Sequence, residues 1–200
     1  MPASASPGTS ALRVLALADE PPHAPIAELV GAFEPELILV LGDLEPAWTD
    51  GLAGIDLPKL GVYGNHDAPG ALDALGVEDL HLRRAELGGV SFSGLGGSPR
   101  YSRHGQHEWT EDEAEQMIRR LPSAAVLLAH SPPAGVNDDP DDPVHRGSPA
   151  LRAWMERNEP AWLLHGHTLP HPGRHVSHVG PTRVVHVRGA LPLELTLDSP

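Results

Sequence analysis

The sequence predicts an α/β domain with a sheet-rich core. Short β-type runs recur along the chain, helical patterns separate the early runs, and the last part has strands with few helices between them. Several of these runs also end in an acidic or metal-binding residue. In an open α/β sheet, ligands bind in the crevice beyond the carboxyl ends of the strands, so this pattern indicates a site there.

Eight segments have the composition of strands, because they are mainly apolar and are bounded by Gly, Pro, Asp or Asn. They are residues 12–18, 36–41, 59–63, 90–93, 125–129, 161–164, 183–187 and 193–197. No repeat of fixed period relates them. We therefore expect one compact domain rather than an array of structural repeats.

Three segments carry helix signals. Residues 25–33 repeat apolar side chains at helical spacing. Residues 110–121 open with Thr110 and three acidic residues, which is a capping box, and close with two arginines near the negative end of the helix. Residues 148–158 begin with Ser148 as N-cap, followed by proline at the first helical position.

Two long connections, residues 96–108 and 131–147, are rich in Gly, Pro, Asp, His and Arg. Loops of this length without periodicity are uncommon in compact domains and are often functional.

The composition restricts the classes of function. A formal charge of −13 argues against a broad nucleic-acid surface, because nonspecific binding depends on Lys and Arg neutralising phosphates. With no cysteine and 13 histidines, any metal must be held by His, Asp, Asn or Glu. The apolar runs are far shorter than the roughly 20 residues that span a bilayer, so we expect no membrane association.

The first ten residues are small and polar and lack the pattern of a secretory signal. We expect a flexible tail over residues 1–10, a single domain over residues 11–200, and a cytoplasmic protein.

Five strand ends carry residues that can bind a metal. Any one of them alone is more often structural, because Asp and Asn are common in turns and N-caps after strands. Together they favour a site. They are Asp19, Asp43, Asn65, His130 and His167.

In this order, the motifs resemble those of the calcineurin-like metallophosphoesterases, and the match runs through nearly the whole chain. The four residues from Gly64 to Asp67 are the most specific piece, whereas the Gly-Asp pair ending at Asp43 is weaker. Residues 94–101, 130–133 and 145–147 also resemble a bacterial branch of that family. The resemblance implies a four-layer α/β/β/α sandwich of two mixed β-sheets flanked by helices, with two metal ions at the strand ends.

The resemblance also implies residue roles. Asp43 would bridge the two metals, and one metal position would be completed by Asn65, His130 and His167. His66 would donate a proton and contact the phosphate. We place Asp67 and Arg100 in the same catalytic group, and Arg100, Arg103 and Arg146 are candidates to hold phosphate oxygens by forked hydrogen bonds.

The other metal position departs from the family pattern. It should combine Asp19 and Asp43 with histidines where this chain has Pro21 and Leu169, neither of which binds metal through its side chain. In a regular strand Glu20 would point to the face opposite to Asp19, so it can act as a metal ligand only if the chain turns directly after Asp19. The substitute ligands to consider are Glu20, His23 and His171.

Two functions are consistent with these observations. The first is a hydrolase: a metal-dependent phosphatase or phosphodiesterase acting on a small phosphorylated molecule through a metal-activated water, with one or two divalent transition metals. Manganese is expected first, with iron, zinc or nickel as alternatives. The second is a catalytically weak or inactive relative that binds a ligand or metal in a regulatory role. The enzyme is favoured because His66 and a full ligand set are retained.

Overall fold

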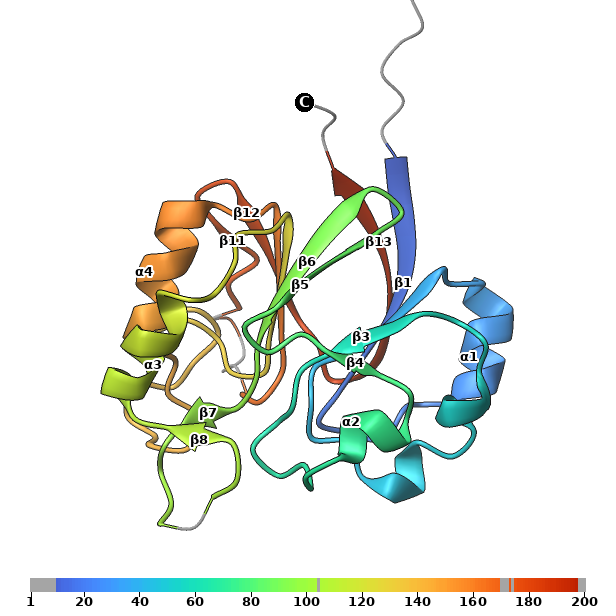
Figure 1. The fold of residues 1–200 in the computed structure, drawn as a ribbon, viewed down its shortest axis with the longest axis horizontal. Coiled ribbons are helices and arrows are strands. Elements are labelled where there is room, and N and C mark those ends of the chain that lie inside the picture. Colours follow the sequence, from blue (N-terminus) through green and yellow to red (C-terminus); the bar gives the residue numbers. More distant parts are fainter. Residues whose placement is uncertain (1–9, 104, 170–172, 174, 198–200) are drawn as a thin grey trace, which may run out of the picture.

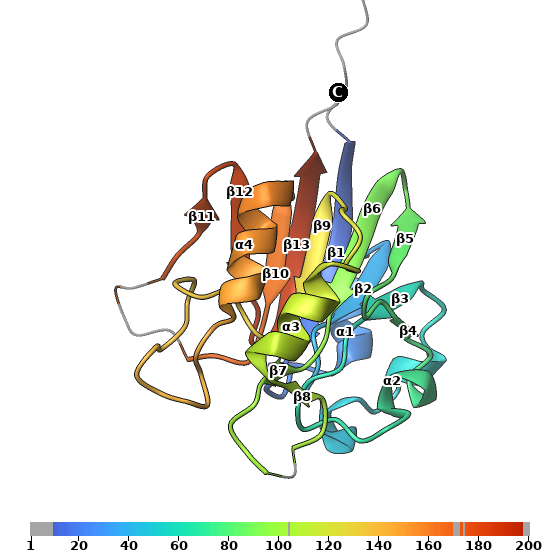
Figure 2. The same cartoon turned by 60° about the vertical axis from the view of Figure 1, so that its left-hand side comes forward.

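The computed structural model describes residues 10–103, 105–169, 173 and 175–197. These residues form four layers, with two β-sheets face to face and helices on both outer sides (Figure 1). Helices α1 (Ile26–Phe33) and α2 (Ala71–Ala74) lie on one side, and α3 (Glu111–Ile118) and α4 (Pro149–Asn158) lie on the other. Figure 2 shows α3 and α4 in front of the second sheet. The expected four-layer sandwich is confirmed.

The first sheet has five strands in the order β13-β1-β2-β3-β4. Strand β1 pairs in parallel with β2 and antiparallel with β13, so the sheet is mixed. Two 3₁₀ turns, η1 (Pro46–Trp48) and η2 (Leu52–Gly54), lie between β2 and β3. The strands are β1 (Ser10–Ala18), β2 (Leu37–Val40), β3 (Lys59–Gly61), β4 (Glu78–Asp79) and β13 (Gly189–Leu197).

The second sheet has six strands in the order β11-β12-β10-β9-β6-β5 and is also mixed. Its strands are β5 (Arg84–Leu87), β6 (Val90–Leu95), β9 (Val126–Ala129), β10 (Trp162–His165), β11 (His178–Val179) and β12 (Thr182–His186). A separate pair joins β7 (Ser98–Pro99) to β8 (Glu108–Trp109).

Three apolar clusters hold the layers together. One lies between the sheets, one between the first sheet and its helices, and one between the second sheet and its helices. Strand β1 contributes to two of them, because Val14 and Ala16 face the other sheet while Leu15 and Leu17 face α1. A strand buried on both faces reads as a near-continuous apolar run, which is why residues 12–18, apolar except for Arg13, were recognisable from sequence.

The eight expected strands and three expected helices are present, with bounds that shift by a few residues. The capping box is confirmed: Thr110 Oγ1 accepts a hydrogen bond from Glu113 N (3.3 Å), and the Glu113 carboxylate accepts one from Thr110 N (2.7 Å). Ser148 caps α4 by accepting from Leu151 N. Helix α3 ends at Ile118, three residues earlier than expected.

Residues 1–9 lie outside the described residues, and Ser10 already belongs to β1 rather than to the expected tail. The single domain over residues 11–200 stays a prediction. Within the described ranges, no helix is long and apolar enough to cross a membrane.

Candidate metal centre

The predicted strand-end residues gather at one edge of the two sheets. Asp19 follows β1, Asp43 follows β2, and His66 follows β3, while His167 follows β10 of the other sheet. All four line one cavity of about 450 Å³. The crevice expected at the carboxyl ends of the strands is therefore present.

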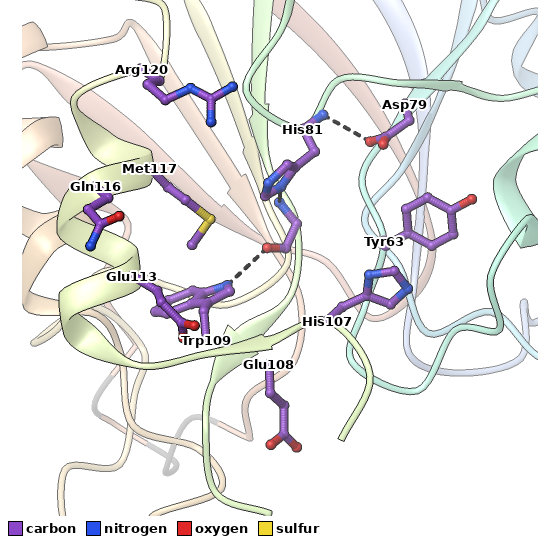
Figure 3. A pocket seen from close by; sticks show the side chains of 11 residues that line it. Tyr63, Asp79, His81, His107, Glu108, Trp109, Glu113, Gln116, Met117 and Arg120 are labelled. Atoms are coloured by element: carbon purple, nitrogen blue, oxygen red, sulfur yellow. Dashed lines mark hydrogen bonds between the residues drawn. The ribbon is translucent and has the colours of Figure 1, made fainter. Parts of the chain in front are cut away.

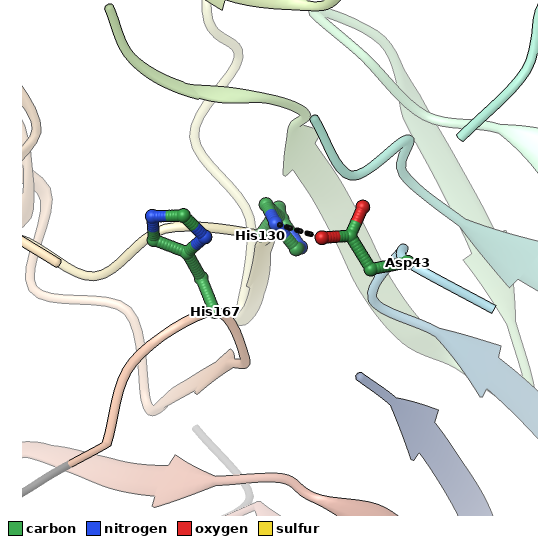
Figure 4. Close-up of side chains that lie close together, drawn as sticks. All are labelled: Asp43, His130 and His167. Atoms are coloured by element: carbon green, nitrogen blue, oxygen red, sulfur yellow. Dashed lines mark ion pairs between the residues drawn. The ribbon is translucent and has the colours of Figure 1, made fainter. Parts of the chain in front are cut away.

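Asp43, His130 and His167 form the centre of this site (Figure 4). One ligand atom from each lies within 4.8 Å of the other two. In the part of the chain that the structure describes, this is the one group of three or more His, Asp or Glu side chains that approach so closely. All three belong to the five predicted metal ligands.

The His130 ring has a defined orientation. Its Nδ1 donates a hydrogen bond to the Leu41 carbonyl (2.7 Å), and the side chain is fully buried. Its Nε2 therefore faces the site, 3.0 Å from Asn65 Oδ1 and 3.4 Å from Asp43 Oδ2. A backbone carbonyl that orients a histidine in this way is the usual support of a metal-binding ring.

The Asn65 amide is oriented by Tyr101. Asn65 Nδ2 donates to the Tyr101 hydroxyl (2.9 Å), so Oδ1 is the atom presented to His130. A histidine nitrogen, an amide oxygen and a carboxylate oxygen thus converge, and all three are electron-pair donors. Such a set fits a bound cation, because without one only a proton on His130 can relieve the repulsion between acceptors.

His167 is held by the second long loop. Its Nε2 donates to the Val144 carbonyl (2.7 Å), which leaves Nδ1 as the atom free to bind a metal. Its backbone N–H donates to Asp19 Oδ2 (2.8 Å). Residues 131–147, expected to be functional from their composition, therefore contribute to the orientation of a candidate ligand.

Burial and charge shift the pKa values of these groups. Burial alone would lower the pKa of His130, but its hydrogen bond and charge interaction with Asp43 raise it to about 9. Burial and the nearby His130 lower the pKa of His167 to about 3. Burial opposes ionisation of Asp43, yet His130 keeps the pKa of that carboxyl below its usual value. Burial raises the pKa of Asp19 to about 6.

The backbone at the site is unusual. Asp19, Asp43 and His167 have positive φ angles of 57°, 54° and 67°, a conformation that costs a non-glycine residue roughly 1–2 kcal/mol. Glycines beside them allow close approach, since a Cβ on Gly64 would overlap the Asp43 carboxylate and one on Gly166 would overlap the Asp19 carboxylate. This crowding explains why glycine recurs beside the candidate ligands.

Asp67 is part of the supporting frame. Its Oδ2 accepts from the backbone N–H groups of Gly64 (2.7 Å) and Asp43 (3.0 Å), and its Oδ1 accepts from Leu44 N (3.2 Å). Its carboxylate is therefore committed to holding two ligand loops together. A positioning role is a better account of Asp67 than a direct role in proton transfer.

The structure does not bring the predicted phosphate-binding arginines into the cavity. The Arg100 guanidinium instead contacts the Glu113 carboxylate and the Glu108 carbonyl, both at 3.3 Å, because helix α3 lies beside it. Arg146 Nη2 donates to the Arg100 carbonyl (3.2 Å). Arg103 is exposed, and it is likewise not among the residues that line the cavity.

The second metal position has a different set of neighbours. The chain turns directly after β1, with Glu20 N donating to the Ala18 carbonyl (2.6 Å), so Glu20 does reach the cavity. There its carboxylate forms an ion pair with Arg188. Leu169 lines the same wall and is 53% exposed. His23 is exposed outside the cavity, and His171 lies outside the described residues.

Sequence reasoning missed Arg188 and Tyr101. Arg188 follows the predicted strand over residues 183–187, so the strand-end rule points to it, but a search restricted to metal ligands passes over an arginine. No sequence signal identifies Tyr101 as the partner of Asn65.

A larger hollow of about 520 Å³ lies beside Tyr63, His81, Trp109 and Met117 (Figure 3). None of the predicted ligands lines it. Of the predicted ligands, Asp19, Asp43 and His167 line the smaller cavity, whereas Asn65 and His130 are buried and line neither.

A family model described as calcineurin-like phosphoesterase matches residues 13–171. The chain belongs to this family. Calcineurin-like phosphoesterases generally hydrolyse phosphoesters and typically bind divalent metals, and the group of Asp43, His130 and His167 is the corresponding candidate in this member.

Solved structures agree in fold. One crystal structure, 18% identical, aligns over 92% of this chain and 95% of its own with a TM-score of 0.69. A crystal structure of a protein from Thermus thermophilus, also 18% identical, aligns over 90% of both chains with a TM-score of 0.60. A search of curated proteins found no match.

Proposed function

We propose that this calcineurin-like phosphoesterase hydrolyses a phosphomonoester or phosphodiester of a small molecule, using one divalent transition metal held by Asp43, Asn65, His130 and His167. One observation carries the proposal: the free donor atoms of these side chains converge while their other polar atoms are engaged by the protein. Manganese is expected first, since a carboxylate, an amide oxygen and two imidazoles suit it, and iron, zinc and nickel are alternatives.

A bound divalent ion lowers the pKa of its water and neutralises charge on the phosphoryl group. The chain supplies the remaining functions. His66 lines the cavity, and its backbone N–H donates to Asp43 Oδ1 (2.8 Å), which places its ring beside the ligands. The ring Nε2 is 3.4 Å from the Tyr101 hydroxyl. His66 is the group that protonates the leaving oxygen, because histidine is the side chain that most often acts as a general acid in enzymes.

The first test is hydrolysis of a panel of phosphomono- and phosphodiesters with Mn, Fe, Co, Ni or Zn. We expect Asn65→Ala to lose metal affinity and turnover together, and His66→Ala to lose turnover while it keeps the metal. His23→Ala is the matched control, because His23 is exposed and outside the cavity. No turnover above that of the Asn65→Ala, His66→Ala double variant would refute the proposal.

Metal content per chain tests the stoichiometry. We expect one ion in the wild type, because the second position offers Pro21 and Leu169, and an increase toward two in Leu169→His and in the Pro21→His, Leu169→His double variant. Two ions in the wild type would contradict a single-ion site and would mean that Glu20, His23, His171 or water completes the second position.

The second candidate is a regulatory protein that binds a ligand or metal without turnover. The observation that favours it is the second metal position, where the Arg188–Glu20 ion pair and the exposed Leu169 line the cavity together with Asp19. Turnover that disappears in His66→Ala contradicts this candidate, whereas metal binding with no turnover on any ester supports it.

A further inference from the structure

We propose that Arg188 binds a phosphoryl oxygen of the substrate and supplies the positive charge that a second metal ion would otherwise provide. The inference rests on the proposed phosphoesterase function and identifies a further substrate-binding residue in the same cavity. It starts from the altered position, where Pro21 and Leu169 provide no ligand.

Topology places Arg188 at that position. Arg188 directly precedes β13, and Gly189 of β13 pairs with Ala18 at the end of β1. Asp19 and Glu20 are the next residues along the chain from Ala18. Arg188 therefore lies across from Asp19 and Glu20, and all three line the cavity.

The charges around the cavity need a cation. Five acidic residues line it: Asp19, Glu20, Asp43, Glu45 and Asp67. Among the described lining residues, Arg188 is the one lysine or arginine. A phosphate group entering this cavity would otherwise meet only the metal as a fixed positive charge, and an isolated anion beside carboxylates is strongly disfavoured.

The ion pair with Glu20 leaves Arg188 able to bind an anion. A guanidinium has five N–H donors, and one carboxylate uses at most two of them. The side chains of Arg188 and Glu20 are each 45% exposed, so the remaining donors are within reach of a ligand. Glu20 then acts as a positioning residue that holds the guanidinium at the cavity.

The test uses inorganic phosphate as the probe on manganese-loaded protein, with calorimetric titration. We expect Arg188→Gln to weaken phosphate binding by about 10- to 100-fold, the usual size of a charge-assisted contact, with metal content unchanged. Arg188→Lys should recover part of the loss, because it keeps the charge but not the fork. Arg119→Gln, which breaks another exposed Arg–Glu pair, at the end of α3 and outside the cavity, is the matched control.

Glu20→Gln separates binding from a structural role. If Arg188 only anchors Glu20, both variants should behave alike; if it binds phosphate, Arg188→Gln loses far more affinity than Glu20→Gln, which keeps the guanidinium and loses only its support. Unchanged phosphate affinity in Arg188→Gln overturns the inference even when the wild type is an active enzyme. An inactive wild type in which phosphate binding still depends on Arg188 supports the inference while hydrolysis itself fails.

Discussion

Metal binding at the centre should release one proton per ion at neutral pH. In the metal-free protein, His130 has a pKa of about 9 and carries a proton at pH 7.5, whereas His167, with a pKa of about 3, carries none. Asp43 is already ionised because its pKa is lowered. The metal must displace the proton from His130 Nε2, so its apparent affinity should rise about tenfold per pH unit between about pH 7 and 8.5 and level off above about 9.

Calorimetric titration with Mn²⁺ at pH 7.5, in buffers of different ionisation enthalpy, counts the protons. His66→Ala is the control and should release the same number, because it removes no ligand. Release of no proton would mean that His130 is neutral in the metal-free protein. That result would refute the assignment of donors and acceptors at His130. Release of two protons would mean that His167 is also charged or that the metal-bound water ionises at this pH, and His167→Ala separates the two cases.

Three further predictions concern the support of the site. Tyr101→Phe frees the Asn65 amide and should weaken metal affinity about 10- to 100-fold in a metal titration, with little change in folding; an unchanged affinity would mean that Tyr101 does not orient Asn65. Gly64→Ala pushes on the Asp43 carboxylate and should lower the free energy of unfolding by about 1–3 kcal/mol and abolish metal binding, measured by denaturation and elemental analysis. Burial holds the pKa of His165 at about 3 in the folded protein, whereas its pKa in the unfolded chain is near 6.5. Below pH 6.5 only the unfolded chain binds the proton, so the folded state loses stability as the pH is lowered. The stability difference between wild type and His165→Gln should therefore change by about 1.4 kcal/mol per pH unit between about pH 5.5 and 4, and a constant difference would contradict this account.

The longer elements of the fold were predictable because their signals are local. Residues 14–18 of strand β1 are all apolar and are buried on both faces, and helix α3 carries its own capping box. Strands β4, β7, β8 and β11 have two residues each, and helix α2 has four. Elements this short form through tertiary pairing and leave no periodic pattern.

The residues of the candidate site also differ in how well the sequence predicts their positions. Positions at strand ends are fixed by chain direction, so the sequence predicts that Asp43 and His130 lie close together, as they do in the structure. Their role as metal ligands stays a prediction. Arg100 was placed in the cavity because the sequence locates it in a loop but not the direction of its side chain. That direction is decided by Glu113, which belongs to a neighbouring helix.

The pairing of β1 with β13 has a consequence for how the protein is made. These strands come from opposite ends of the described chain, yet they are aligned from Ser10 opposite Leu197 to Ala18 opposite Gly189. Contacts between such distant segments form late, because a long loop must close first. During synthesis, Arg188 can therefore lie beside Asp19 only after almost all of the described chain has been made. A nascent chain lacking only its last strand would already contain the proposed metal ligands Asp43, His130 and His167, while Arg188 would still lack the strand pairing that places it beside Asp19.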